Sequence, residues 1–155
     1  MESGKRSCFV RSASEQDLPA MVGLLQELFA IEADFQGDPD TQERGLRLLL
    51  AQPGARIWVA EDGGRVVGMC TLQVLISTAE GGPVGLIEDV VVMGEFRNAG
   101  IGRMLLETAE AWAVEQGLSR LQLLADIGNG RALGFYERMG WKPTQLVGLR
   151  RKLRG

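Results

Sequence analysis

The sequence lacks histidine entirely and holds one tyrosine and two cysteines in 155 residues. Without histidine, the chain cannot form a His-based triad, use a histidine as general base or build most transition-metal sites. Cys8 and Cys70 form no CxxC motif and lie in apolar, strand-like segments, which favours buried structural thiols over a reactive cysteine or a disulfide. Proton transfer in an enzyme of this composition depends on carboxylate, tyrosine, lysine, cysteine or water, and we expect no metal.

Long apolar runs and an excess of positive charge are missing as well. No apolar run approaches the ~20 residues that span a bilayer, and residues 1–7 are polar, unlike a signal peptide. The net charge of −3 gives no electrostatic reason to expect a nucleic-acid partner. We therefore predict a cytoplasmic protein with no membrane or nucleic-acid partner, and 155 residues fit a single domain, 1–155.

Apolar spacing and turn residues predict a mixed series of strands and helices. The segment 84–93 is almost wholly apolar, so we expect a central strand covered on both faces. The whole pattern predicts an α/β (α+β) fold, a mixed sheet with helices on both faces. The expected strands are 8–11, 56–61, 65–77, 84–93, 121–125 and 141–153, and the expected helices follow a Ser14 cap, run from a cap at Asp40 or Thr41 to Leu50, and cover 100–116 and 129–139.

A glycine-containing turn, Arg97-Asn98-Ala99-Gly100-Ile101-Gly102, joins the central strand to the next helix. Gly100 and Gly102 lack Cβ atoms, so a phosphate can approach the backbone closely. The first N–H groups of the helix have no intrahelical partner, and the helix dipole favours an anion there. Arg97 and Arg103 can add positive charge. The turn therefore indicates a pyrophosphate site made mainly of backbone, or else a connection whose glycines only permit a tight turn.

The same turn resembles the acetyl-CoA signature of the GNAT superfamily of N-acetyltransferases, Arg/Gln-x-x-Gly-x-Gly/Ala, at Arg97, Gly100 and Gly102. A second segment resembles that superfamily's Asn-x-x-Ala-x-x-Phe-Tyr…Gly-Phe pattern and comprises Asn129, Ala132, Phe135, Tyr136 and Met139-Gly140-Trp141. The resemblance covers nearly the whole chain. It implies the acyl-CoA N-acyltransferase fold, with a mostly antiparallel sheet and a splayed central strand pair, and acetyl-CoA as co-substrate.

The resemblance implies a role for each part of the donor site. The pantetheine arm would lie in the splayed gap and pair with the backbone of the central strand, whose valines could instead serve only as core. The turn would hold the pyrophosphate, and the second segment would contact the cofactor from the far side. The implied cofactor-binding residues are Val90, Val91, Val92, Arg97, Asn98, Ala99, Gly100, Ile101, Gly102, Arg103, Asn129, Ala132 and Tyr136.

Two residues are candidates for catalysis. The resemblance implies that Tyr136, the only tyrosine, protonates the departing CoA thiolate, whereas the alternative is a core aromatic. Glu88 interrupts an apolar strand, where a carboxylate is costly to bury, so it is our candidate base for the attacking amine, directly or through water. Glu88 could alternatively bind loop N–H groups or an arginine. Adjacent strand residues point to opposite faces, so at most one of Glu88 and Asp89 should face the acetyl group.

The acceptor is predicted only as a class. The resemblance implies transfer to a primary amine by direct attack in a ternary complex; the amine belongs to a small amine, amino sugar, amino acid, polyamine or protein. Glu32 and Asp34, with Glu88 and Asp89, would suit a cationic acceptor, unless the loop they belong to is merely solvated. A module that binds acyl-CoA without turnover is the other reading. Homodimers are common in the superfamily, and the strand-like C-terminus is the segment expected to pair.

Overall fold

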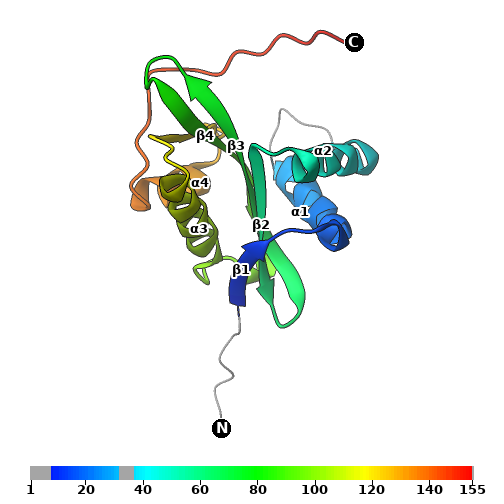
Figure 1. Ribbon diagram of the computed structural model, residues 1–155. Helices are drawn as coiled ribbons and strands as arrows, with labels where there is room; N and C mark the ends of the chain where they lie inside the picture. Colours follow the sequence, from blue (N-terminus) through cyan, green and yellow to red (C-terminus); the bar gives the residue numbers. More distant parts are fainter. Residues whose placement is uncertain (1–7, 32–36, 155) are drawn as a thin grey trace. The chain divides into compact units, whose positions relative to one another are not determined.

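The computed structural model of the chain describes residues 8–31 and 37–154 (Figure 1). The chain divides into two compact units, Met1–Leu123 and Leu124–Gly155, which are treated one after the other.

The first unit contains a five-stranded sheet in the order β1-β2-β3-β4-β5. Neighbours from β1 to β4 are antiparallel, whereas β5 runs parallel to β4. Gly63 and Gly64 form the tight turn between the second and third strands with φ of 60° and 80°, as the Asp-Gly-Gly sequence predicts. The mostly antiparallel sheet is thus confirmed. Its strands are β1 Cys8–Ser12, β2 Ala55–Asp62, β3 Arg65–Ser77, β4 Gly82–Val92 and β5 Leu121–Leu123.

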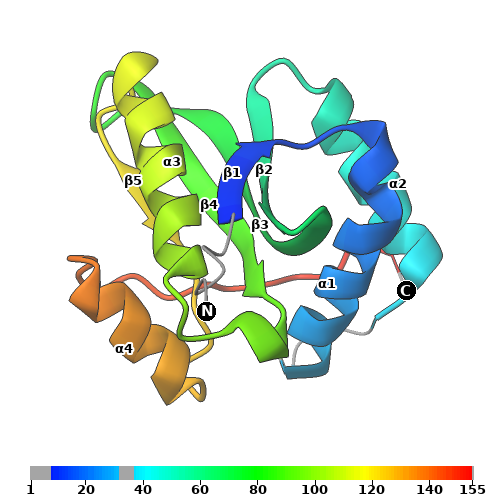
Figure 2. The same cartoon turned by 90° about the horizontal axis from the view of Figure 1, so that it is seen from below.

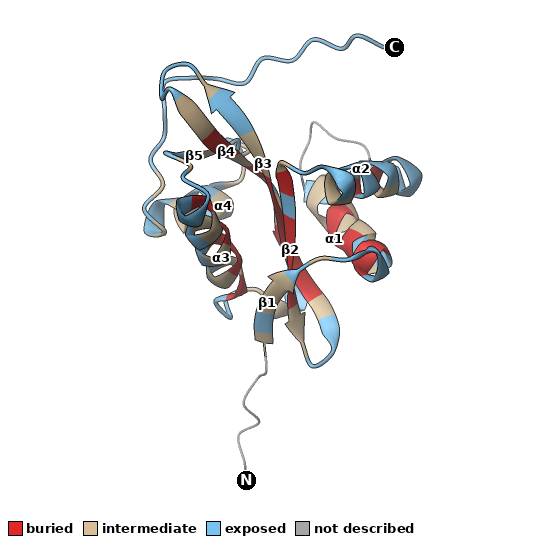
Figure 3. Ribbon diagram, viewed as in Figure 1, coloured by how far each residue is buried: buried red, intermediate tan, exposed pale blue. Residues whose placement is uncertain are grey.

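Helices cover both faces of this sheet. Helices α1 (Leu18–Ile31) and α2 (Pro39–Ala51) lie on one face, and α3 (Ile101–Glu115) lies on the other (Figure 2). Burial is concentrated in the layers between helices and sheet (Figure 3). On the first face, side chains of α1 and α2 such as Met21 and Leu46 pack in one buried cluster with Met69 of β3. Each helix therefore buries its apolar face against the sheet, as the apolar periodicity of the sequence predicts.

On the α3 face, Gly68 of β3 lets the helix approach closely. A Cβ atom at Gly68 would lie 3.2 Å from side-chain atoms of both Ile101 and Leu105. Both of these α3 residues are buried. The first turn of α3 is therefore held firmly against the centre of the sheet, which fixes the place of the glycine-containing turn before it.

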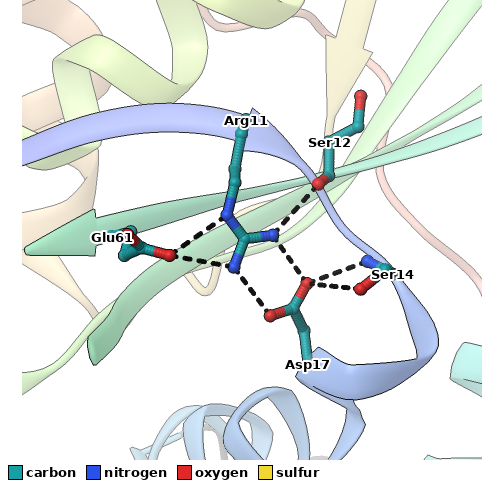
Figure 4. A network of polar contacts seen from close by, with 5 residues as sticks. All are labelled: Arg11, Ser12, Ser14, Asp17 and Glu61. Carbon is teal, nitrogen blue, oxygen red and sulfur yellow. Dashed lines mark hydrogen bonds and ion pairs between the residues drawn. The ribbon is translucent and has the colours of Figure 1, made fainter. Parts of the chain in front are cut away.

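An ionic network fastens β1 and the short helix η1 (Glu15–Asp17) to β2 (Figure 4). Arg11 donates hydrogen bonds of 2.8 and 2.9 Å to Asp17, and of 3.2 and 3.1 Å to Glu61. The Ser14 N–H also donates to Asp17 at 2.8 Å. The hydrogen bonds from Arg11 lower the pKa of Asp17, although its burial acts in the opposite direction. The network sets the start of α1, which follows η1 directly.

The second unit contains one helix, α4 (Gly130–Arg138). Residues 141–154 form neither helix nor strand, so the predicted strand at 141–153 is wrong for this chain. A strand needs a neighbour to pair its N–H and C=O groups, and no described strand pairs with these residues. Several boundaries differ by one or two residues; among them, β5 stops at Leu123, not 125, and Asp38 caps α2 in place of Asp40 or Thr41.

Candidate functional site

The site begins where β4 loses one of its two neighbours. Gly85, Leu86 and Ile87 pair with β5, and this pairing ends at Leu123. From Glu88 to Val92, β4 pairs only with β3 among the described strands. Along this second half, no described strand pairs with β4 on the β5 side, as the predicted splayed strand pair requires.

A β-bulge marks the change between the two halves of β4. Thr71 pairs with Glu88 and Met69 pairs with Val91, so Cys70 faces two residues of β4. One of them, Asp89, has a left-handed backbone with φ of 52°, which is uncommon for a residue other than glycine. The regular register of β4 is therefore interrupted directly after Glu88, and the expectation that at most one of Glu88 and Asp89 faces the acetyl group stays a prediction.

The two adjacent carboxylates have different surroundings. Glu88 is exposed, and its carbonyl oxygen accepts a 3.1 Å hydrogen bond from the Thr71 hydroxyl. Asp89 is half-buried, and its charge acts on the buried thiol of Cys70. Burial, with Asp89 as a smaller cause, raises the pKa of Cys70 to about 12. Cys70 is therefore an unreactive thiol, and neither Cys8 nor Cys70 is in a disulfide.

The turn after β4 presents backbone N–H groups at the start of α3. Asn98 and Gly100 have positive φ, of 64° and 80°, and both are exposed. Gly100 is the N-cap of α3 and provides no side-chain cap. The helices α2 and α4 differ, because the side chains of Asp38 and Asn129 cap them. The first N–H groups of α3 are thus left for an external acceptor, and an anion is the acceptor that the helix dipole favours.

The two arginines of the turn have unequal settings. The Arg97 Nε donates a 3.3 Å hydrogen bond to the carbonyl oxygen of Val92, which ties the turn to the end of β4. Arg103 is exposed, and its Nε lies 3.9 Å from a carboxylate oxygen of Glu107, one helical turn away. Arg97 therefore positions the turn besides adding charge, a role that the sequence did not indicate.

The candidates of the second unit lie at the start and middle of α4. The Asn129 Oδ1 accepts a 3.1 Å hydrogen bond from the Ala132 N–H, which leaves the Asn129 NH2 group as a donor for a ligand. Tyr136 is half-buried, with its ring centroid 5.3 Å from that of Phe135 and 6.1 Å from that of Trp141. These ring contacts orient Tyr136, and they are compatible with both roles considered for it.

The predicted acidic surface is only partly within the described residues. Glu32 and Asp34 lie outside them. Asp38 accepts hydrogen bonds from the Asp40 N–H at 3.1 Å and the Thr41 hydroxyl at 2.8 Å, which lower its pKa. Asp38 therefore has a structural role as the cap of α2.

The described part of the chain shows neither a candidate metal centre nor a candidate membrane span. Residues 8–31 and 37–154 contain no group of three or more His, Cys, Asp and Glu side chains placed to hold a metal ion. Within the same residues, no helix combines the length and the apolar character needed to cross a membrane.

Sequence reasoning missed the bulge and the residues of β3 that face it. The sequence predicts Thr71 and Cys70 only as residues of an apolar strand. It does not predict the bulge opposite them, because a bulge depends on how two segments distant in sequence pair. The adjacent acids Glu88-Asp89 inside an apolar run were the signal that regular pairing is broken there.

The fold and this site define an α/β protein in which an opened central strand leads to an anion-accepting helix start. Residues 21–141 match the sequence model of the Acetyltransferase (GNAT) family, and the match reaches into both compact units. The chain belongs to this family and is an acetyl-transferring enzyme of the N-acetyltransferase type.

Known relatives differ in the acceptors that their names give. The aminoalkylphosphonate N-acetyltransferase of Salmonella typhimurium is 31% identical over 137 residues, covering 88% of this chain and 86% of that protein. A putative ribosomal protein bS18-alanine N-acetyltransferase of Bacillus subtilis is 26% identical over 119 residues, covering 77% of this chain and 75% of the relative. The structure of an aminoglycoside N-acetyltransferase in complex with CoA has a TM-score of 0.84 over 99% of this chain and 100% of that one; its 16% identity shows the fold alone.

Proposed function

We propose that this protein transfers the acetyl group of acetyl-CoA to the primary amine of a small molecule, within a ternary complex. The observation that carries the proposal is the open edge of β4 from Glu88 to Val92, followed directly by the uncapped start of α3. Together these provide a strand edge that no other described strand covers, followed by a helix start that has no side-chain cap.

The donor fits this surface in two parts. The pantetheine arm of CoA contains amide groups, which can pair with Val90 and Val92 as an added strand pairs with a sheet edge. The pyrophosphate is an anion and suits the N–H groups from Asn98 to Arg103. Arg97, held to Val92, adds positive charge beside them. From the second unit, the Asn129 amide and the first turn of α4 at Ala132 would contact the cofactor arm.

The acyl transfer requires two proton movements. The amine nitrogen forms a bond to the thioester carbonyl carbon, and the carbon–sulfur bond breaks. Glu88 accepts the proton of the amine, directly or through a water, because a protonated amine has no lone pair for attack. Tyr136 donates its phenolic proton to the leaving CoA thiolate, which prevents the thiolate from attacking the product. Backbone N–H groups beside the bulge polarise the thioester carbonyl.

The acceptor class rests on the acidic residues and on the relatives. Glu88 and Asp89 lie on the open strand, and Glu32 and Asp34 belong to the segment between α1 and α2; all four would attract a cationic amine. The relative that matches this chain over 88% of its length is named for aminoalkylphosphonates, so these compounds head the acceptor panel. Transfer to a protein N-terminus is the second candidate, which the relative named for bS18 favours. We also propose a single domain over 1–155, a cytoplasmic location and a homodimer.

The decisive experiment measures CoA thiol release from acetyl-CoA across a panel of amines. The panel contains aminoalkylphosphonates, aminoglycosides, polyamines, amino acids and a peptide with an N-terminal alanine. We expect turnover with at least one small amine. Binding of CoA without thiol release on any amine would identify a binding module, and a melting temperature that CoA does not change would contradict the donor site itself.

A further inference from the structure

A buried hydroxyl group lies beside the bulge of β4. Thr71 of β3 is 1% exposed, and its hydroxyl donates a 3.1 Å hydrogen bond to the carbonyl oxygen of Glu88. Its neighbours in the chain, Cys70 and Leu72, are buried as well. A valine has nearly the same shape, favours strands equally and brings no polar group that needs a partner. Packing alone therefore does not require a hydroxyl at this position, and the hydrogen bond is what distinguishes Thr71 from an apolar core residue.

The backbone direction in the first half of β4 follows from the hydrogen bond of Gly85. Its N–H donates at 3.0 Å to the carbonyl of Arg120, the residue before β5, so it points away from β3. Because backbone groups alternate in direction along a strand, the N–H and C=O of Glu88 point toward β3. The hydrogen bond that the Glu88 carbonyl accepts from Thr71 agrees with this direction.

The other end of β4 has the opposite phase. The Met93 N–H donates a 2.8 Å hydrogen bond to the carbonyl of Val67 in β3, so it points toward β3. By the same alternation, the N–H of Val91 points toward β3, whereas the N–H of Val90 points away from it. Glu88 and Val91 thus have the same direction although they are an odd number of positions apart. The bulge between them accounts for this change of phase.

The change of phase places two consecutive N–H groups on one side of β4. The peptide between Glu88 and Asp89 is trans, so the Asp89 N–H points opposite to the Glu88 carbonyl and away from β3. The N–H of Val90 points away from β3 too, and the left-handed φ of 52° at Asp89 permits this arrangement. On this side, no described strand pairs with β4 from Glu88 to Val92. Both N–H groups are therefore directed where the proposed acetyl-CoA would lie.

We infer that Thr71 is a positioning residue for acetyl transfer: its hydroxyl holds the peptide group between Glu88 and Asp89, so that the N–H groups of Asp89 and Val90 point together at the thioester carbonyl oxygen. The inference rests on the proposed function. As the amine nitrogen bonds to the carbonyl carbon, an electron pair of the C=O bond moves to the oxygen, and it returns as the carbon–sulfur bond breaks. Two N–H donors that are already directed at this oxygen stabilise its charge. Thr71 acts through the backbone of β4 and makes no bond to either substrate in this scheme.

Two substitutions at Thr71 and one matched control test this role through the kinetics of thiol release. Thr71→Val keeps the shape and removes the hydroxyl, so kcat should fall by about tenfold or more, while the Kd of CoA stays the same. Thr71→Ser keeps the hydroxyl and should retain most of the wild-type kcat. The control Thr108→Val removes a hydroxyl that donates a 2.8 Å hydrogen bond to the Met104 carbonyl within α3, and it should leave kcat unchanged. A merely structural hydroxyl would alter the urea midpoint and not the kcat of the folded protein.

Amide NMR of the wild-type protein tests the two donors without any substitution. Acetyl-CoA and CoA differ only by the acetyl group, so the difference between the two spectra should be largest at the amides of Asp89 and Val90. In Thr71→Val this difference should diminish at Asp89. The shifts that both ligands cause from Asn98 to Arg103 should stay as in the wild type, because those groups lie in the turn and not at the bulge.

Three results would overturn the inference. Wild-type kcat in a folded Thr71→Val means that the hydroxyl is only structural. A loss of kcat in both Thr71→Val and Thr71→Ser means that the shape of the side chain, and not its hydroxyl, is what matters. Acetyl-dependent shifts that fall away from Asp89 and Val90 mean that other groups hold the carbonyl, and this result needs no variant to fold. A wild-type protein that shows the expected shifts and releases no thiol with any amine contradicts the proposed function and not the direction of the two N–H groups.

Discussion

Gly85, Leu86 and Ile87 of β4 pair with strands on both sides, whereas Glu88 to Val92 of the same strand pair on one side only. The first half is an ordinary part of a sheet core. The second half starts at a bulge, keeps the apolar side chains of a core strand and leaves backbone groups open on one edge. Within a single strand, the difference between the core segment and the proposed binding surface is thus the presence or absence of a second neighbouring strand.

This comparison explains why apolar residues can serve in a binding site. Val91 is buried by its side chain, 5% exposed, while the backbone of the same segment remains open toward the β5 side. The carboxylates stand at the boundary between the halves. We therefore expect changes in the first half to alter stability, and changes in the second half or in the turn to alter catalysis and CoA binding.

The largest expected effect is on turnover, from Glu88→Gln at the boundary. The glutamine keeps the shape of the side chain and cannot accept the proton of the amine, so kcat should fall by about 10²–10⁴-fold. The acidic limb of the pH–rate profile should vanish with it. Glu80→Gln, before the other end of β4, is the control and should keep wild-type turnover. Retention of the acidic limb in Glu88→Gln would assign the base to another group.

A substitution at Gly85 disrupts the half of β4 that pairs with β5. A Cβ atom there would lie 2.5 Å from a methyl of Leu121 and 3.0 Å from one of Leu118, so Gly85→Val overfills the contact of β4 with β5. We expect the free energy of unfolding in urea to fall by about 1–3 kcal/mol, with the CoA affinity of the folded protein unchanged. Gly45→Ala, in α2 with no atom near its Cβ position, is the control and should not destabilise. A selective loss of CoA affinity in Gly85→Val would remove the functional distinction between the halves.

A substitution at Gly100 disrupts the turn that follows the open half of β4. The Gly100 φ of 80° is left-handed, and no protein atom lies within 4 Å of its Cβ position, so Gly100→Val strains the backbone without a clash inside the protein, while its side chain also obstructs the proposed phosphate. A cost of about 1–2 kcal/mol is expected, seen as weaker CoA binding in calorimetry. Gly117→Val is matched to it, since Gly117 has φ of 74° and equally free surroundings at the other end of α3. Equal CoA affinities in the two variants would show that the turn does not hold the cofactor.

The smallest expected effect is at Asp17, which lies outside both halves of β4. A substitution there tests whether stability can change while CoA binding stays the same. Because the pKa of Asp17 is lower in the folded chain, the unfolded chain takes up the proton first as the pH falls. Stability from this group is therefore present above about pH 4 and is lost below it. Asp17→Asn should lower the free energy of unfolding by about 1 kcal/mol at pH 7. The variant should also lose less stability than the wild type as the pH falls. Urea unfolding at several pH values measures both effects. CoA affinity at pH 7 should not change.

Much of the first unit follows from the sequence, because local rules decide it. Apolar spacing predicted α1 and α3, and the Asp62-Gly63-Gly64 turn predicted the hairpin of β2 and β3. The motif around Gly100 placed the turn correctly, since positive φ and an uncapped helix start are local properties. The bulge opposite Cys70 did not follow, because it arises from the register of two strands. The expected strand at 141–153 failed for a related reason: its residues have a strand pattern, but a strand forms only where an edge accepts it.

The most direct test of the account is a titration of the isotope-labelled protein with CoA, followed by amide NMR. The account predicts that the largest shifts fall on the amides of Val90, Val92 and the segment from Asn98 to Arg103, while Leu86 and Ile87 in the paired half of β4 change little. Shifts that spread equally over both halves of β4, or that gather away from the strand and its turn, would contradict it.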